Sequence, residues 1–305
     1  MAEVRPRPDE RRPTRTSALP NLFVIGASKS GSSALHTYLS AHPDIAMSRE
    51  KEPCFFVDRS ELAEAWPIMA RQPCSHDLDA YLALWPDGAD KRYRGEGSVY
   101  YSQAPHKSGV PERIARMCPD ARIIYTVREP VWRAIGHYWQ RFKEFQEPLP
   151  LDRAVRENAL YRDTSDYALQ LAAYRDHFDP ARIHVIVAED LRTRRRETLA
   201  DLIAWLGLPP HLFRDDEITD RHVSPPDSRR QRFPLVARLR DSGLWARTRR
   251  HLPERAVGLL REGATVRFDK AEVDDSAARD WLSGYLRPRR AAFEEMIGRR
   301  IPEWD

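Results

Sequence analysis

The sequence predicts an α/β fold of three layers, in which helices cover both faces of a central parallel β-sheet and a helical segment caps the C-terminal end. Two observations support this fold class. Residues 22–25, 122–127 and 183–187 form short, almost wholly apolar runs, which are typical of strands buried on both faces of a sheet. Helical patterns separate these runs, and strands that alternate with helices usually pair in parallel.

Composition and charge limit the classes of function. The chain has 305 residues, of which 41% are hydrophobic and 31% charged, so it can bury a large core as an ordinary soluble protein. A net charge of +4 suits anionic ligands, but no dense basic run with interleaved aromatic residues indicates a nucleic-acid partner. The three cysteines lack C-x-x-C spacing, which argues against a disulfide framework or a zinc site and for a cytoplasmic location.

Two segments differ from the rest in composition. Residues 1–20 are rich in arginine and proline, and we expect a disordered arm there. Residues 21–305 are expected to form one domain, in which 221–262 would cover the substrate or cofactor, and 221–250 shows no clear strands. The chain contains neither the apolar core of a signal peptide nor an apolar run of membrane-spanning length, so no integral membrane segment is expected.

Local patterns predict the other elements. Residues 122–127 are the best strand, because they are apolar and rich in β-branched side chains, and a helix follows from Pro130. Gly207 is well placed to end a helix over 197–206. Further strands are expected at 45–47 and 93–101, and further helices at 34–39, 60–70, 77–85, 111–117 and 166–178 and in the last forty residues.

The stretch Asn21–Leu39 indicates an anion site. A buried strand leads into the small-residue loop Gly26–Ser33, and Ser32 or Ser33 is available to cap the helix that follows. This order points backbone N–H groups and the positive end of a helix dipole at a phosphate, although glycine and serine are also ordinary residues of such loops. The spacing is not that of a Walker A loop, because Lys29 lies inside the loop, and no metal site is expected.

A second basic residue occupies an equivalent place. Arg128 follows the strand at 122–127, just as Lys29 follows the strand at 22–25. Ligands of open parallel sheets bind at the carboxyl ends of the strands, so the two side chains are expected at one site. From the residues alone, Lys29 could still be a plain surface lysine, and Arg128 could pair with a neighbouring carboxylate.

Three separated motifs carry a family resemblance. They are Lys29–Leu35, which reads KSGSSAL, Glu50–Phe56, which reads EKEPCFF, and Arg128–Tyr138, which reads REPVWRAIGHY. These motifs resemble the 5′-phosphosulfate loop, the K-E-x-H-F-F segment and the 3′-phosphate motif of sulfotransferases that use 3′-phosphoadenosine-5′-phosphosulfate (PAPS). The chain looks closest to the heparan sulfate N- and 3-O-sulfotransferases and their bacterial relatives, and the resemblance implies a fold similar to that of P-loop kinases.

The resemblance also implies roles. The implied cofactor-binding residues are Lys29, Ser30, Gly31, Ser32, Ser33, Ala34, Arg128, Gly136, Arg229 and Arg230. Lys29 would also be catalytic, because it can stabilise charge on the phosphate as it leaves. Glu52 is the candidate base for the acceptor hydroxyl, since partial burial beside Phe55 and Phe56 would raise the pKa of its carboxyl. The alternative for Glu52 is a solvated loop of charged residues, and His137 is expected at the surface or the substrate rim.

The chain departs from the family pattern at several positions. Gly136 has no hydroxyl where the family has a serine, and Cys54 stands where a histidine often follows the glutamate. Gly97 replaces a lysine that lies near the acceptor in the heparan enzymes. Arg229 and Arg230 are the nearest counterpart of a second basic segment, a K-G-R-like run. Without a placed histidine and an oxyanion hole, Cys54 is not expected to be a nucleophile.

The sequence therefore predicts an enzyme that transfers the sulfuryl group of PAPS to a hydroxyl, or less readily an amine, and releases adenosine 3′,5′-bisphosphate (PAP). The acceptor would be a small molecule, a lipid or a glycan, for example in bacterial secondary metabolism. Two alternatives stay open. An ATP-dependent phosphotransferase of small molecules should carry a Walker lysine and a Mg²⁺ carboxylate. A non-catalytic nucleotide-binding protein would be compatible with Gly136 and Cys54.

Overall fold

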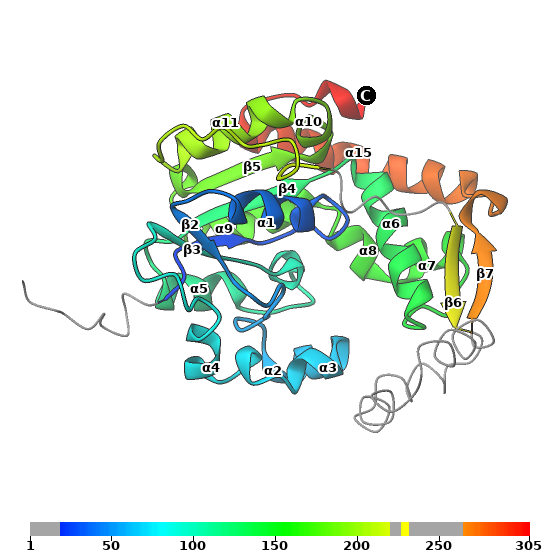
Figure 1. Ribbon diagram of the computed structural model, residues 1–305. Helices are drawn as coiled ribbons and strands as arrows, with labels where there is room; N and C mark the ends of the chain where they lie inside the picture. The colour runs from blue at the N-terminus through cyan, green and yellow to red at the C-terminus, as the bar shows by residue number, and fades with distance from the viewer. Residues whose placement is uncertain (1–18, 220–226, 232–264) are drawn as a thin grey trace, which may run out of the picture.

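A five-stranded parallel sheet of order β2-β3-β1-β4-β5 forms the centre of the molecule (Figure 1). The computed structural model describes residues 19–219, 227–231 and 265–305. The strands of this sheet are β1 Leu22–Val24, β2 Ile45–Met47, β3 Tyr93–Gly97, β4 Arg122–Val127 and β5 Ile183–Val187. Val24 pairs with Gly97 on one side and with Ile124 on the other. Because all pairs are parallel, the carboxyl ends of the strands meet at one edge, as the sequence predicted.

Helices precede and follow these strands along the chain. The helices of the described residues are α1 Ser32–Ser40, α2 Arg59–Ala65, α3 Pro67–Ala70, α4 Leu78–Leu82, α5 Val110–Met117, α6 Pro130–Lys143, α7 Leu151–Glu157, α8 Ala159–Asp163, α9 Tyr167–Arg175, α10 Ala188–Thr193, α11 Arg195–Trp205 and α15 Ser276–Ile297. Short 3₁₀ turns occur at Pro73–Ser75, Val99–Ser102, Pro180–Arg182, Lys270–Glu272 and Pro302–Trp304.

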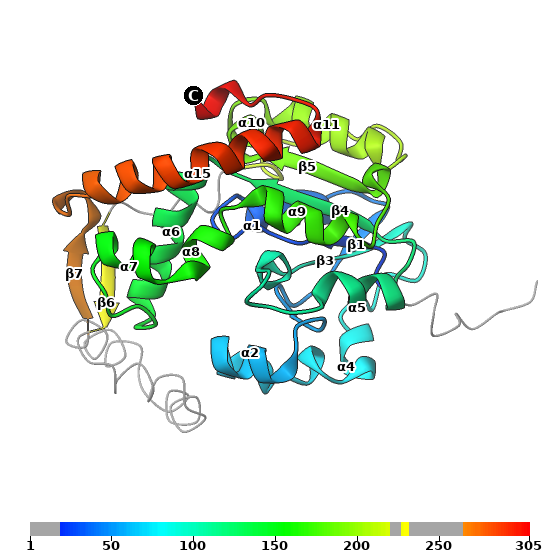
Figure 2. The same ribbon diagram turned by 180° about the vertical axis from the view of Figure 1, so that it is seen from behind.

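Alternation along the strands divides the core into two layers. On β1, Phe23 packs with α2, α4, α5 and α9 on one face of the sheet, and Leu22 and Val24 pack with α1, α10 and α11 on the other. Figure 2 shows α5 and α9 on the near side of the sheet in that view. Successive side chains of a strand point to opposite faces, so a run that is apolar throughout supplies both layers. The predicted three-layer α/β fold is therefore confirmed.

A third apolar cluster lies beside the sheet. Helices α6, α7 and α8 pack there against the first half of α15, whose Leu282 and Leu286 are buried. The second half of α15 returns to the main core through Phe293. The C-terminal helix thus joins the α6–α8 cluster to the sheet, in agreement with the predicted helical cap.

The structure corrects three local expectations. The strand expected over 93–101 ends at Gly97, where a 3₁₀ turn begins at Val99, and the helix expected over 60–70 is broken between α2 and α3 at Pro67. Residues 227–231 form strand β6 (Asp227–Gln231), which pairs antiparallel with β7 (Thr265–Asp269), so the expectation of no clear strand in 221–250 is wrong there. The remainder of that segment, and residues 1–18 of the expected arm, lie outside the described residues.

Candidate cofactor and catalytic site

The loop after β1 is anchored to the neighbouring strand β4. The amide of Ala27 donates to the Thr126 carbonyl at 2.5 Å. Thr126 in turn donates its amide and its hydroxyl to the Gly26 carbonyl at 2.6 and 2.7 Å. Gly26 has a φ of +128°, and a Cβ atom there would collide with the Ser102 hydroxyl, so the position requires glycine. The loop is therefore held at the carboxyl edge of the sheet.

The first turn of α1 presents N–H groups that no side chain caps. Its N-cap is Gly31, with a φ of +85°, and no acidic residue lies in the first turn. The expectation that Ser32 or Ser33 caps the helix is wrong, because both residues already lie inside it. The uncapped N–H groups and the positive end of the dipole favour an anion at this point. Ser30 is fully buried just before it, with its hydroxyl beside that of Tyr167.

Lys29 lies against α6. A Cβ atom at Gly136 would be 3.4 Å from both Cβ and Cγ of Lys29, so the stem of the lysine packs on the helix where there is no side chain. Burial lowers the pKa of Lys29, as do the nearby Lys143 and Arg128, while Glu144 raises it. The structure thus brings together two residues, Lys29 and Gly136, that belong to different sequence motifs, and Lys29 is partly buried rather than fully exposed.

Arg128 reaches the same site from the end of β4. The Tyr167 hydroxyl holds its backbone, because it donates to the Arg128 carbonyl at 2.6 Å and accepts from the Arg128 amide at 3.2 Å. The guanidinium forms no hydrogen bond or ion pair within the described part of the chain. The neighbouring Glu129 instead caps α6, accepting from the amides of Val131 and Trp132 at 3.1 and 2.7 Å. Arg128 is therefore available to an anionic ligand.

The second arginine of this motif has a structural role. Arg133 is fully buried, and it donates to the Ser165 hydroxyl at 2.7 Å and to the Tyr161 carbonyl at 2.8 Å. Its Nη1 atom lies 3.3 Å from His137 Nδ1. His137 is buried too, so the expectation of a surface or rim position is wrong. Burial lowers the pKa of His137 well below its usual value, and the Arg133 charge adds to this shift.

Glu52 sits at the carboxyl end of β3. Its amide donates to the Gly97 carbonyl at 3.0 Å, and its φ of +65° is left-handed. Its carboxylate is paired with Lys51, and 17% of its side chain is exposed. The side chain is thus partly buried, as expected, but its partner is a cation. Burial raises the pKa of the nearby Cys54 thiol well above its usual value, which opposes a thiolate nucleophile.

Two further lysines, which sequence reasoning missed, join the site. Lys143 follows Gly136 by seven residues on α6, about two turns, and so lies on the same face of the helix. Burial and the nearby Lys143 and Lys29 lower the pKa of Lys270, which follows β7. The chain has only six lysines, so the sequence could have suggested that each lysine is a candidate for the anion site.

Arg229 and Arg230 lie on β6, which runs beside α6 (Figure 1). In the antiparallel β6–β7 pair they lie opposite Arg267 and Val266. Their side chains are outside the described residues, so their expected contact with the nucleotide stays a prediction.

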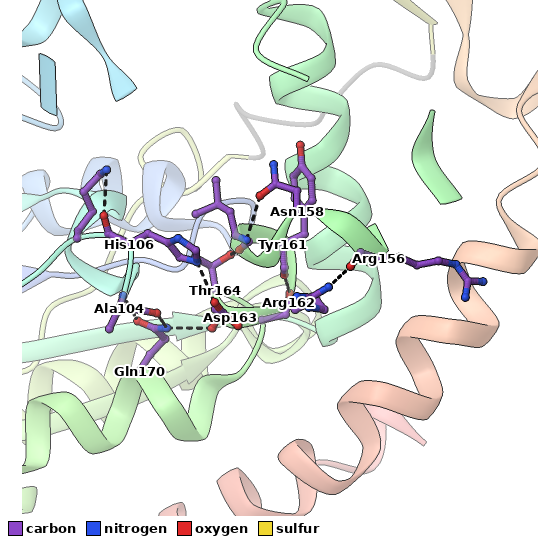
Figure 3. A network of polar contacts seen from close by, with 12 residues as sticks. Ala104, His106, Arg156, Asn158, Tyr161, Arg162, Asp163, Thr164 and Gln170 are labelled. Atoms are coloured by element: carbon purple, nitrogen blue, oxygen red, sulfur yellow. Dashed lines mark hydrogen bonds and ion pairs between the residues drawn. The ribbon is translucent and has the colours of Figure 1, made fainter. Parts of the chain in front are cut away.

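A polar network holds the loop that follows β3 and its 3₁₀ turn (Figure 3). Gln170 accepts from the Ala104 amide at 2.8 Å and donates to the carbonyls of Ala104 and Asp163 at 2.7 and 2.9 Å. His106 Nε2 lies 2.9 Å from the Asp163 carboxylate. The network therefore joins the loop after β3 to α8 and α9.

Comparison with known proteins places this geometry in a family. The model of the sulfotransferase family matches residues 20–213. The chain belongs to the sulfotransferase family. Human bifunctional heparan sulfate N-deacetylase/N-sulfotransferase 3 is 24% identical over 314 residues, which cover 94% of this chain and 31% of that protein. Human heparan sulfate glucosamine 3-O-sulfotransferase 3B1 is 27% identical over 290 residues, which cover 94% of this chain and 65% of that protein.

The fold is similar to that of a solved bacterial sulfotransferase. The crystal structure of a sulfotransferase from Alicyclobacillus acidocaldarius superposes with a TM-score of 0.64 at 24% identity and covers 94% of this chain and 98% of that one. The family resemblance read from the three motifs is therefore confirmed. The chain spans about a third of the N-sulfotransferase relative and just under two thirds of the 3-O-sulfotransferase. Within the described ranges, no helix is long and apolar enough to cross a membrane.

Proposed function

We propose that this member of the sulfotransferase family is a cytoplasmic enzyme that uses PAPS. It would transfer the sulfuryl group to a hydroxyl, or an amine, of a small-molecule, lipid or glycan acceptor and release PAP. The observation that carries the proposal is the meeting of Lys29 and Arg128 at the ends of adjacent strands, with the uncapped start of α1 beside them. Such an arrangement suits a ligand with two separated anionic groups.

The residues present fit such a ligand. The N–H groups of the Ser30–Ala34 segment and the Lys29 ammonium would take the 5′ end, because helix starts and ammonium groups both favour phosphate oxygens. Arg128, whose guanidinium has no partner among the described side chains, would take the 3′-phosphate. Gly136 offers no hydroxyl, and the Lys29 stem lies within contact distance, 3.4 Å, of the point where a serine Cβ would stand. The bound anion would also relieve the repulsion among the clustered cations.

Each residue of the site would have a separate role in the transfer of the sulfuryl group. PAPS supplies the sulfuryl group when bound. Lys29 would stabilise the charge that develops on the 5′-phosphate side, and the loop amides would do the same from a fixed position. Glu52 would accept the proton of the acceptor group. Lys143, two turns beyond Gly136 on the face of α6 that Lys29 contacts, would add a second positive charge beside Lys29.

Ligand-dependent melting tests the proposal. PAP at about 100 times its Kd should stabilise the protein by about 2.7 kcal/mol, a rise in Tm of roughly 5 °C or more, whereas ATP with Mg²⁺ should give little change. Lys29→Ala should remove most of the shift. Lys91→Ala is the matched control, because Lys91 precedes β3 at the opposite edge of the sheet.

Other outcomes would favour the alternatives. Stabilisation by ATP with Mg²⁺ alone would support a phosphotransferase and contradict this proposal. Binding of PAP without any release of PAP from PAPS would support a non-catalytic nucleotide-binding protein.

A further inference from the structure

Glu96 is a fully buried carboxylate at the centre of a hydroxyl network. It lies on β3, close to the end of the strand that carries Gly97. Its Oε1 atom accepts hydrogen bonds from the hydroxyls of Tyr81 and, at 3.0 Å, Tyr101. Its Oε2 atom accepts from the Ser98 hydroxyl at 3.0 Å. The carboxylate therefore fixes the direction in which each of the three hydroxyls donates.

These hydroxyls in turn hold the segment that follows Glu52. The Ser98 oxygen accepts from the Cys54 amide at 3.2 Å, and the Tyr101 oxygen accepts from the Phe56 amide at 3.3 Å. The Tyr81 ring stacks on Phe55, with centroids 4.2 Å apart and planes within 9°. Each of residues 54–56 thus contacts Ser98, Tyr81 or Tyr101, through a hydrogen bond or a ring stack. The hydroxyls of these three side chains all donate to the Glu96 carboxylate.

The segment needs such support, because its backbone is strained. Glu52 and Cys54 have φ values of +65° and +56°, and left-handed backbone at a residue other than glycine costs on the order of 1–3 kcal/mol. The Glu52 carbonyl accepts from the Cys54 thiol at 3.2 Å, so a shift at Cys54 is passed directly to Glu52. Conformations of this kind persist only where the surroundings over-determine them.

We propose that Glu96 is the positioning residue for Glu52: acting through Ser98, Tyr101 and Tyr81, it holds the Glu52–Phe56 segment so that the Glu52 carboxylate faces the acceptor. The inference rests on the proposed function, since it assigns a purpose to the geometry of the candidate base. Because Glu96 is fully buried, we do not expect it to contact the nucleotide or the acceptor. Its removal should therefore lower turnover and leave the nucleotide site intact.

The first test separates positioning from general stability. Glu96→Gln and Ser98→Ala should lower kcat at least 10-fold for release of PAP from PAPS to water, with KM for PAPS and Kd for PAP within about twofold of the parent protein. Ser98→Thr, which restores the hydroxyl, should recover most of the rate. Tyr93→Phe is the matched control, because it removes another buried hydroxyl of β3, one that donates to the Leu206 carbonyl at 2.7 Å.

A double-mutant cycle and hydrogen exchange complete the test. If Glu96 acts through Glu52, Glu96→Gln should add no further loss of kcat to Glu52→Gln. Amide exchange of residues 51–57 should accelerate in Glu96→Gln and Ser98→Ala and not in Tyr93→Phe. Additive losses of kcat, or unchanged exchange in that segment, would overturn the proposal. Failure of the parent protein to bind PAP would instead overturn the proposed function, and the exchange result would still decide whether Glu96 holds the segment.

Discussion

The contact between Gly136 and Lys29 predicts different effects for a small and a large substitution at position 136. A Cβ atom at Gly136 would lie 3.4 Å from Cβ and Cγ of Lys29, which is an ordinary contact distance. Gly136→Ala therefore needs no movement, and because glycine in a helix interior costs about 0.5–1 kcal/mol relative to alanine, it should raise Tm by roughly 2–3 °C. The Kd for PAP should stay within about twofold of the parent value.

Gly136→Val should behave differently. Its γ-methyl groups extend beyond a Cβ atom that already touches the lysine stem, so Lys29 must move away from α6. The loss of one charge-assisted hydrogen bond is worth about 1.5–3 kcal/mol, so PAP should bind roughly 10- to 150-fold more weakly. Calorimetric titration with PAP and thermal melts of both variants measure these effects. Equal Kd values for the alanine and valine variants would refute the reasoning.

The remaining predictions concern buried and available charges. Arg128→Ala should weaken PAP binding roughly 10- to 100-fold with little loss of stability, whereas Arg133→Ala should destabilise the fold by about 3–5 kcal/mol, because Arg133 is fully buried and hydrogen-bonded. Titration and melts of both variants check this, and equal losses of stability would contradict it. Burial raises the pKa of Glu96 from 4.5 to about 7. Its contribution to stability should therefore be full below pH 4.5 and lost as the pH rises to about 7, by at most about 3 kcal/mol. Denaturant unfolding at pH 5 and 8 should show a smaller pH dependence in Glu96→Gln than in the parent, and an equal dependence would be inconsistent with a buried acid.

Local sequence patterns were sufficient to predict the main strands of this protein and the end of one helix. The strands at 122–127 and 183–187 were predicted with the bounds that the structure shows, because a continuous apolar run of that length has few alternatives to a buried strand. The end of α11 was equally readable, since Gly207 adopts the left-handed conformation, with a φ of +67°, that its place after a helix requires. Arg128 could be selected because it directly follows a predicted strand, and Lys29 because it lies in the loop after the apolar run at 22–25, since ligands of parallel sheets bind at strand ends.

Contacts between distant segments decided what sequence reasoning missed or got wrong. His137 looks like a surface residue by type, yet it is buried, because Arg133 lies one helical turn away and Tyr161 packs edge-on against its ring. In the sequence, Glu96 looks like any carboxylate on a strand. Only the folded chain brings Tyr81 of α4 and Tyr101 of the 3₁₀ turn close enough to donate hydrogen bonds to it. Lys143 and Lys270 share no motif and meet only in the folded chain.

By itself, the sequence determined the fold class and the family, and it singled out the two residues that we propose as anchors of the ligand, because these depend on short apolar runs and on motifs within single loops. The tertiary structure alone decided that Lys29 packs on Gly136, that Gly31 rather than a serine is the N-cap of α1, and that a buried carboxylate supports the segment of Glu52. Those features depend on distances between residues tens of positions apart, and such distances are set by packing rather than by local pattern.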